Sequence, residues 1–248
     1  MGNTEAGART TTPLSGRTAL VTGASRGIGA SVARKLAALG TTVAVTARSI
    51  DTLERLALEL GDGAAAIPCD MALPDAVDAM ALAAAQVLGG PPDILVLNAG
   101  AFGIAPAHEE EPDNFDRMIR VNLTGPFRLL RAFLPDILTR GTGHIVTVGS
   151  IADRGIFPGN AAYAAGKFGL RALHETLRAE LKGSGVRASL VSPGNTDTSL
   201  WDPIDPDNRP GFAPRSAMLS ADAVAESIAW VVTAPASVNV DELRLSRA

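Results

Sequence analysis

Short apolar runs alternate along this chain with longer segments in which apolar residues recur every three or four positions. The short runs are typical of buried strands, and the longer spacing is typical of amphipathic helices. Residues 18–22 form the first strand signal, and residues 28–39 follow as a helix that Gly40 ends. The alternation therefore predicts strand–helix–strand units through most of the chain.

The predicted elements alternate regularly. Strands are expected at 18–22, 42–46, 64–69, 94–97, 144–148, 187–191 and near Leu243, and helices at 28–39, 49–60, 74–88, 112–138, 161–182 and 221–232. Strands separated by helices indicate a parallel sheet covered on both faces. Because crossovers between parallel strands are right-handed, the pattern predicts an α/β, doubly wound parallel sheet, Rossmann-like, in a single domain.

Two stretches lack periodicity. Residues 1–12 are rich in Thr, Gly and Ala, and we expect a flexible N-terminal tail before a domain at 13–248. Residues 200–216 contain four prolines and three aspartates. An irregular stretch of that length within a compact domain is usually functional, so we expect a substrate loop or lid there.

Composition and charge narrow the classes of partner. The net charge is −4 and aromatic residues make up 4% of the chain, which argues against a nucleic-acid partner. The lone Cys69 excludes an intrachain disulfide and reads as an apolar filler. The histidines at 108, 144 and 174 lack metal-ligand spacing, so we expect surface or loosely packed residues and no metal. No apolar run reaches the ~18 residues of a spanning helix, so we expect a cytoplasmic protein without membrane contact.

A glycine-rich turn follows the first predicted strand, in the segment Thr22–Gly29 (TGASRGIG). Residues without a Cβ let backbone approach a pyrophosphate closely, and the helix that follows offers free N–H groups to that anion. The position between a strand and a helix is the context that makes such a pattern credible. The segment predicts dinucleotide binding, and an ordinary strand–turn–helix corner is the alternative.

The end of the second predicted strand indicates which nicotinamide cofactor binds. NAD sites usually place an acid there to hold the ribose 2′-hydroxyl, and this chain has Ala47 and Arg48 instead. Arg48 and Arg26 can together hold a 2′-phosphate. We therefore predict NADP(H) as the cofactor, with solvated surface charge as the alternative for the two arginines.

Tyr163 and Lys167 are four residues apart in a predicted helix, so their side chains share one face. A cation about 4 Å from the phenol supplies roughly 4 kcal/mol at an effective dielectric of ~20. We therefore expect Lys167 to lower the pKa of Tyr163 and Tyr163 to act as general acid or base. Ser150 follows the strand 144–148, at the sheet edge where ligands bind, and its hydroxyl can orient the reacting oxygen. Each residue alone is more often structural than functional.

The chain resembles the short-chain dehydrogenase/reductase family over residues 14–199. The resemblance rests on the motifs already described together with Asn98-Ala99-Gly100, Asn122, the five-residue segment from Tyr163 to Lys167, and Pro193-Gly194, in the family's order and spacing. Members similar to 3-oxoacyl reductases and short-chain alcohol dehydrogenases fit best. The resemblance implies an NADP-dependent oxidoreductase that transfers hydride between NADP(H) and a ketone, aldehyde or secondary alcohol.

The resemblance also implies roles for individual residues. Asn122 would support a water-linked proton path from Lys167, and Lys167 would hold the nicotinamide ribose. For Asp70 and Thr198, a helix N-cap or turn role remains the alternative. The catalytic set is Asn122, Ser150, Tyr163 and Lys167, and the cofactor set is Gly23, Ser25, Arg26, Gly27, Ile28, Gly29, Arg48, Asp70, Asn98, Ala99, Gly100, Tyr163, Lys167, Pro193, Gly194, Thr196 and Thr198.

The expected pocket walls are mostly apolar, which favours a hydrophobic small-molecule carbonyl or alcohol over a sugar phosphate. They are Phe102, Ile104, Ile151, Phe157, Leu200 and Trp201. We expect a homodimer or homotetramer, although the missing glycine-rich C-terminal closure weakens the case for a tetramer. A non-catalytic NADP(H)-binding sensor on the same fold is the main alternative function, and a nicotinamide-using epimerase or dehydratase is another.

Overall fold

The computed structural model describes residues 12–248, so the predicted tail at 1–12 lies outside the described residues except for Thr12. Seven strands form the main sheet, and each pairs with its neighbours in parallel. They are β1 (Thr18–Thr22), β2 (Thr42–Ala47), β3 (Ala65–Pro68), β4 (Ile94–Leu97), β5 (Gly143–Val148), β6 (Val186–Pro193) and β9 (Glu242–Leu245). Their order, β3-β2-β1-β4-β5-β6-β9, confirms the doubly wound, Rossmann-like sheet.

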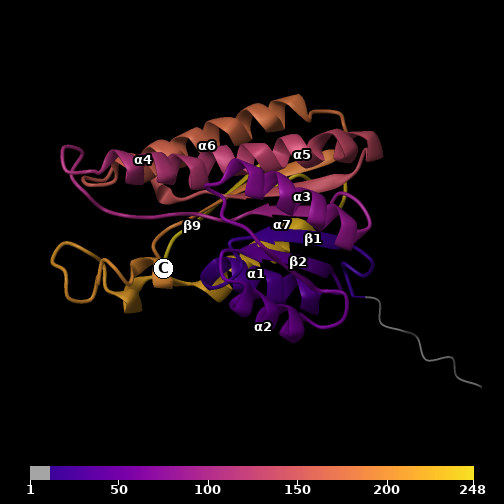
Figure 1. The fold of residues 1–248 in the computed structure, drawn as a ribbon, viewed down its shortest axis with the longest axis horizontal. Coiled ribbons are helices and arrows are strands. Elements are labelled where there is room, and N and C mark those ends of the chain that lie inside the picture. Colours follow the sequence, from indigo (N-terminus) through magenta and orange to yellow (C-terminus); the bar gives the residue numbers. More distant parts are fainter. Residues whose placement is uncertain (1–11) are drawn as a thin grey trace, which may run out of the picture.

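Helices cover both faces of this sheet. Figure 1 shows α3, α5 and α6 on one side of the strands and α1 and α2 on the other. The helices are α1 (Gly27–Ala38), α2 (Ile50–Leu60), α3 (Pro74–Leu88), α4 (Pro112–Ile119), α5 (Gly125–Arg140), α6 (Ala161–Glu180) and α7 (Ala221–Thr233). The strand order reverses between β1 and β4, and such a switch point is where doubly wound sheets bind ligands, at the carboxyl ends of the strands.

Two apolar cores follow from the alternation of side chains along buried strands. Leu20 of β1 packs with residues of α3 and α5 on one face. Its neighbours Ala19 and Val21 pack with residues of α1 and α7 on the other. This burial on both faces explains why the strands read as continuous apolar runs in the sequence.

The predicted helix at 112–138 is three elements in the structure. A π-helical turn, Arg120–Thr124, separates α4 from α5. Pro126 lies in the first turn of α5 and has no N–H, so it cannot donate the α-helical hydrogen bond to the carbonyl of Asn122. The change of helix type therefore falls at a residue predicted to be catalytic.

The irregular segment 200–216 has a defined conformation. Two short paired strands, β7 (Thr196–Asp197) and β8 (Leu219–Ser220), close its base. Arg215 donates hydrogen bonds to Asp197 at 2.8 Å and to Asp202 at 2.6 Å, and its backbone N–H donates to Asp207 at 2.8 Å. One arginine thus holds several parts of the segment together.

Two of the three histidines, predicted to be at the surface or loosely packed, are buried in the structure. His144 and His174 are buried, with relative exposures of 3% and 1%. A hydroxyl partner accounts for each: Ser189 lies 2.8 Å from His144 Nε2, and Thr147 lies 2.9 Å from His174 Nδ1. The prediction of surface or loosely packed positions is wrong for both residues, because local sequence does not show which hydroxyls tertiary packing supplies.

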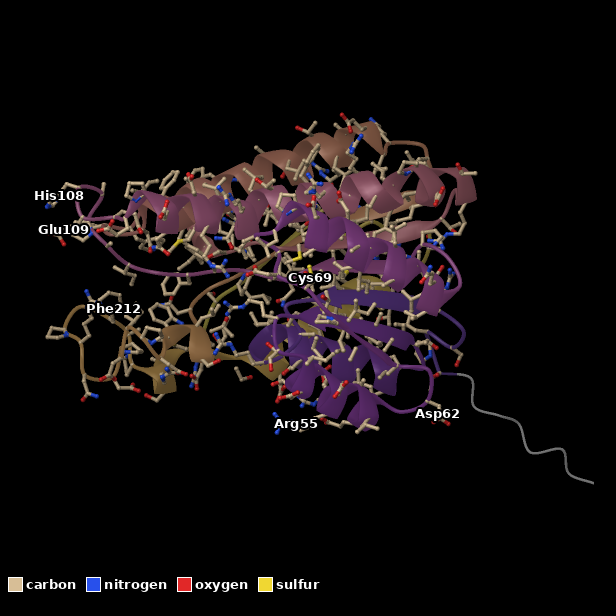
Figure 2. The ribbon with its side chains drawn as sticks, in the orientation of Figure 1. Arg55, Asp62, Cys69, His108, Glu109 and Phe212 are labelled. Atoms are coloured by element: carbon tan, nitrogen blue, oxygen red, sulfur yellow. The ribbon has the colours of Figure 1, made fainter. Side chains whose placement is uncertain are left out.

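Cys69 is buried directly after β3, near the centre of the molecule in Figure 2. No helix within residues 12–248 is long and apolar enough to span a lipid bilayer.

Candidate active site

A cavity of about 1100 Å³ opens along the carboxyl ends of the strands. Every residue predicted to bind cofactor lines it, from Gly23 in the glycine turn to Thr198 after β6. Ser150, Tyr163 and Lys167 line the same cavity, whereas Asn122 lies behind its wall and is fully buried. The fold thus gathers residues that are far apart in sequence around one space.

The glycine turn between β1 and α1 has no room for side chains. Gly23 and Gly27 have φ angles of +68° and +55°, which favour glycine. A Cβ on Gly29 would collide with the carbonyl oxygen of Gly23 and lie 2.5 Å from Asn98 Nδ2. No side chain caps the start of α1, so its first N–H groups remain available to an anion.

Asn98 and Thr22 support this turn from below. Asn98 Nδ2 donates to the carbonyl of Thr22 at 2.8 Å, and Thr22 Oγ1 accepts from the N–H groups of Asn98 and Ala99, each at 2.9 Å. These bonds join the ends of β1 and β4 at the switch point. In this structure Asn98 therefore holds the shape of the cofactor cradle.

Arg26 and Arg48 line the end of the cavity beside β2 and are exposed. Neither pairs with a carboxylate within residues 12–248. Ala47, the last residue of β2, also lines the cavity and offers no acid to a ribose hydroxyl. This end of the cavity is cationic.

At three other predicted cofactor-binding positions, the structure shows contacts or element boundaries that the sequence did not predict. Asp70 accepts from the N–H of Ala72 at 3.0 Å and pairs with Arg117 at 3.2 Å, so its carboxylate already has partners in a turn. Pro193 ends β6 rather than following it. A Cβ on Gly27 would lie 3.0 Å from the Thr198 methyl, so the glycine turn and the loop after β6 are in contact.

The groups at the reacting end are held by β5 and α6. Ser150 begins the 3-10 turn Ile151–Asp153 as its N-cap, and its Oγ accepts from the N–H of Ala152 at 3.1 Å. Lys167 is buried and donates to the carbonyl of Val148 at 2.9 Å. Its Nζ is 5.8 Å from the centroid of the Tyr163 ring.

The electrostatics of this pair differ from the sequence-based expectation. Burial raises the pKa of Tyr163 above its ordinary value, and only a hydrogen bond from Ser150 opposes that effect. Burial also lowers the pKa of Lys167 to about 8. Lys167 therefore does not lower the pKa of Tyr163 here, because both groups are desolvated and the ammonium points to a backbone carbonyl.

Asn122 lies in the π turn between α4 and α5. Its Oδ1 accepts from the N–H of Ala101 and its Nδ2 donates to the carbonyl of Ala101, both at 2.9 Å. A Cβ on Gly100 would lie 3.3 Å from Asn122 Oδ1 and 4.0 Å from Lys167 Nζ. Asn122 and the buried lysine therefore approach the same stretch of backbone from different elements.

Sequence reasoning missed Asp153, a fully buried carboxylate three residues after Ser150. It accepts from the N–H of Ser150 at 3.2 Å and forms a capping box with it. The Ser-x-x-Asp spacing is a known signature of that motif and was readable in the sequence. Arg117, the partner of Asp70, also lines the cavity and carries no such local signal.

Aromatic rings line part of the cavity. Phe102 meets Tyr163 edge-on with centroids 4.9 Å apart and meets Trp201 at 5.0 Å, and Trp201 meets Phe212 at 6.2 Å. In Figure 2, the loop with Phe212 and the segment with His108 and Glu109 both project toward the same side of the view. The cavity wall includes the full set of predicted apolar residues, Phe102, Ile104, Ile151, Phe157, Leu200 and Trp201.

Known proteins resemble the chain over nearly its whole length. An uncharacterized oxidoreductase of Staphylococcus aureus is 30% identical over 94% of this chain and 97% of its own length. The glycine betaine reductase ATRR of Emericella nidulans is 38% identical over 93% of this chain, which spans only 19% of that protein.

Solved structures agree with these relatives. A metagenomic short-chain oxidoreductase in complex with NADP is 36% identical with a TM-score of 0.80, covering 95% of this chain and 99% of its own. An alcohol dehydrogenase of Thermococcus sibiricus complexed with 5-hydroxy-NADP is 32% identical with a TM-score of 0.83, covering 94% and 97%. The short chain dehydrogenase family pattern matches residues 17–209. With this match and the site geometry, the chain belongs to the short-chain dehydrogenase/reductase family of oxidoreductases.

Proposed function

We propose that this protein is an NADP(H)-dependent reductase or dehydrogenase in which Tyr163 exchanges a proton with the oxygen of a ketone, aldehyde or secondary alcohol. The observation that carries the proposal is the meeting of Ser150, Tyr163 and Lys167 in the cavity that also contains the glycine turn. A non-catalytic sensor has no use for a buried lysine beside the chain's single tyrosine.

The residues present fit a dinucleotide. The glycine turn has no Cβ atoms in the way, and α1 begins with uncapped N–H groups, so a pyrophosphate can bind there. Arg26 and Arg48 would hold a ribose 2′-phosphate, and Lys167 would hold the nicotinamide ribose. When bound, the nicotinamide supplies or accepts the hydride.

The protein's own groups manage the proton. Ser150 Oγ accepts from the N–H of Ala152, and its hydroxyl lies within hydrogen-bonding reach of Tyr163, so a substrate oxygen between the two groups could accept from both. In reduction, Tyr163 gives its phenolic proton to that oxygen; in oxidation, the phenolate takes it. Lys167 Nζ lies 5.8 Å from the centroid of the Tyr163 ring, and Asn122 would support a water-linked proton path from Lys167.

Apolar walls support a hydrophobic carbonyl or alcohol as substrate. The rings of Phe102, Trp201 and Phe212 continue from Tyr163 into the segment 200–216, which would act as the substrate lid. Aromatic faces also bind quaternary ammonium groups, and one relative is named a glycine betaine reductase. A quaternary-ammonium aldehyde therefore belongs among the test substrates beside aryl and alkyl ketones.

The test is to mix the protein with NADPH and a panel of ketones and aldehydes and to follow the loss of NADPH absorbance. Tyr163→Phe should reduce kcat by about 10²–10⁴-fold while leaving the Kd for NADPH within a few-fold of the parent value. Tight NADPH binding without turnover of any carbonyl would favour the sensor instead.

The cofactor preference needs its own test. Arg48→Asp places a carboxylate where a 2′-phosphate would bind, so the kcat/KM ratio of NADPH to NADH should fall by at least about 100-fold. Arg55 is an exposed arginine on the outer side of α2, and Arg55→Asp serves as the matched control (Figure 2). An unchanged ratio in Arg48→Asp would remove the case for NADP(H).

We also propose a homodimer or homotetramer assembled through α4, α5 and α6. Phe115, Phe127 and Phe168 on these helices are 37%, 49% and 39% exposed. Apolar side chains of this size are commonly covered in oligomers, and isologous packing of helices would cover them symmetrically. Light scattering on the purified protein and on Phe127→Glu tests this, and a monomeric parent would refute it.

A further inference from the structure

Asp153 is a charged group without any exposed surface, located under the reacting end of the cavity. Its Oδ2 accepts from the N–H of Ser150 at 3.2 Å and from the Ser192 hydroxyl at 2.5 Å. Its Oδ1 accepts from Arg154 Nε at 2.7 Å. The carboxylate, which belongs to the 3-10 turn between β5 and α6, thus connects Ser150 after β5, Ser192 near the end of β6 and Arg154 after the turn.

The neighbouring backbone is shaped around this carboxylate. A Cβ on Gly149 would lie 2.5 Å from Asp153 Oδ2 and 2.6 Å from Ser192 Oγ. The residue preceding Ser150 therefore has to lack a side chain for the carboxylate to reach the Ser150 N–H. The position of Ser150 and the burial of Asp153 depend on the same local geometry.

Arg154 extends the cluster to the C-terminal strand. It pairs with Asp153 on one side and with Glu242 of β9 on the other, and its Nη2 is 3.4 Å from Ser192 Oγ. β9 forms the edge of the sheet beside β6. The strand that completes the sheet is thereby anchored to the turn that carries Ser150.

Burying a carboxylate costs several kcal/mol unless its partners compensate, and apolar packing often replaces such pairs without loss of stability. A buried charge beside reacting groups is therefore better explained by function than by stability. We propose that Asp153, held by Arg154, which Glu242 pairs with in turn, is a positioning residue that fixes Ser150 and sets the charge surrounding Tyr163 and Lys167. The proposal rests on the proposed function for its link to catalysis.

The groups that face this cluster come from several elements. Tyr163 and Lys167 belong to α6, which packs against the 3-10 turn that contains Asp153; Arg154 follows that turn, and Glu242 belongs to β9. The negative charge of Asp153 raises the pKa of Tyr163 and the pKa of Lys167, acting against burial for the lysine and with burial for the tyrosine. Asp153 thus favours the protonated form of both groups.

The decisive experiment uses the fact that Tyr163 is the single tyrosine in the chain. Ultraviolet titration of phenolate absorbance in the whole protein reports on Tyr163 alone and needs neither substrate nor cofactor. Asp153→Asn keeps an oxygen for the Ser150 N–H but removes the charge, so the titration midpoint should move to lower pH. The pH-dependent limb of kcat should move in the same direction, for reduction and for oxidation alike.

Asp93→Asn is the matched control. Asp93 also accepts from a backbone N–H, that of Thr18, and pairs with arginines, but it precedes β4 at the opposite edge of the sheet. This variant should leave the Tyr163 titration and the pH profile unchanged. If Asp153→Asn and Asp93→Asn both titrate like the parent protein, the electrostatic role of Asp153 is overturned.

Two further variants complete the test. Asp153→Ala removes the bond to Ser150 as well, and kcat/KM should fall by about 100-fold relative to Asp153→Asn, because sub-ångström placement matters at this scale. Equal kcat/KM in the two variants would overturn the positioning role. If Asp153→Asn alone fails to fold, Asp153→Asn/Arg154→Met removes both charges together and should still move the titration to lower pH, by less than Asp153→Asn because loss of the Arg154 cation opposes the shift, provided that Asp153 lies closer to the phenol.

Failure of this proposal and failure of the proposed function give different results. If the parent protein turns over no carbonyl, the proposed function fails, yet the Tyr163 titration still measures the charge of Asp153. If the parent turns over and Tyr163→Phe does not, while Asp153→Asn leaves the titration and the pH limb unmoved, only the role of Asp153 is lost.

Discussion

Two buried or half-buried carboxylates, Asp93 and Asp153, hold opposite edges of the same sheet in similar ways. Each accepts from a backbone N–H at or just beyond the end of a strand, from a hydroxyl and from an arginine. Asp93 precedes β4 and joins it to the start of β1, whereas Asp153 follows β5 and joins it to the end of β6. Only Asp153 lies beside groups that would react.

The two carboxylate clusters are built alike, so their different effects on function come from the end of the strands at which each one lies. At the carboxyl edge the helices that follow strands present their N-termini, so the ligand cavity and the titrating groups gather there. At the amino edge, the Asp93 cluster joins the starts of β1 and β4 and, within the described residues, contacts no predicted cofactor-binding or catalytic residue. We therefore expect changes at the carboxyl edge to alter binding and catalysis, and changes at the amino edge to alter stability.

The largest expected effect is at the carboxyl edge, in the glycine turn. Gly29→Ala would place a Cβ against the Gly23 carbonyl and force open the cradle, so the Kd for NADPH should rise by at least about 100-fold, or about 3 kcal/mol. Fluorescence titration with NADPH measures this. Gly61→Ala lies at the amino edge, where a Cβ meets nothing within 4 Å; its φ of +94° makes alanine destabilising there, but the Kd of the folded variant should be unchanged. Equal effects of the two variants would contradict the division between edges.

The converse effect is expected at Asp93. Asp93→Ala leaves the Thr18 N–H and two arginines without their carboxylate, so the free energy of unfolding should fall by about 2 kcal/mol while kcat/KM stays within two-fold. Urea unfolding and initial rates, measured on the same preparation, check both halves of this prediction. A large loss of kcat/KM in the folded variant would mean that the two edges are coupled.

The two buried histidines make the free energy of unfolding depend on pH, which separates effects on stability from effects on catalysis. Burial lowers the pKa of His144 to about 3 and the pKa of His174 to about 4, whereas an unfolded histidine titrates near ~6.5. The unfolded chain therefore binds more protons between these values, so stability is complete above about pH 6.5 and is lost as the pH falls towards 4.

Each histidine should contribute about 1 kcal/mol per pH unit within that window. His144→Gln should make the pH dependence of the unfolding free energy shallower by that amount, measured by urea unfolding from pH 7 to pH 5. His108 is exposed, and His108→Gln should leave the slope unchanged. A parallel slope in His144→Gln would show that His144 is not the titrating group.

The smallest effect is expected in the segment 200–216. Arg215 pairs with Asp197 and Asp202 on partly exposed surface, and such pairs contribute at most about 1 kcal/mol. Arg215→Ala should therefore lower the free energy of unfolding by less than about 1 kcal/mol and raise KM for an apolar ketone a few-fold, with kcat unchanged. Arg55→Ala provides the control, and a loss of kcat instead of a rise in KM would assign the segment a different role.

Local signals predicted most of the fold. β1, β4 and α3 lie at the predicted positions, because a buried strand and an amphipathic helix each leave their period in the sequence. The main error in assigning secondary structure was the single continuous helix predicted at 112–138, which is two α-helices separated by a π-helical turn. A π turn depends on which hydrogen bonds the chain loses at Pro126 and on packing against α6, and periodicity shows neither.

The candidate site was predictable as a set of residues but not as an electrostatic arrangement. The predicted cofactor residues share one cavity, since strand ends of a parallel sheet converge on one edge. The direction of the pKa shift at Tyr163 was not predictable from a four-residue spacing. Burial and the carboxylate of Asp153 set it, and both result from the packing of distant segments.

The sequence by itself determined the alternating strands and helices, the glycine turn and the order of the reacting residues, because each is a local pattern. Only the tertiary structure decided that His144 and His174 are buried and that Asp70 already pairs with Arg117. It also decided that Asp153 is fully buried next to Ser150. These features depend on which groups from different strands and helices come together. The energies of charges and hydrogen bonds depend strongly on the burial and the partners that tertiary packing provides, whereas apolar periodicity is a property of the local sequence.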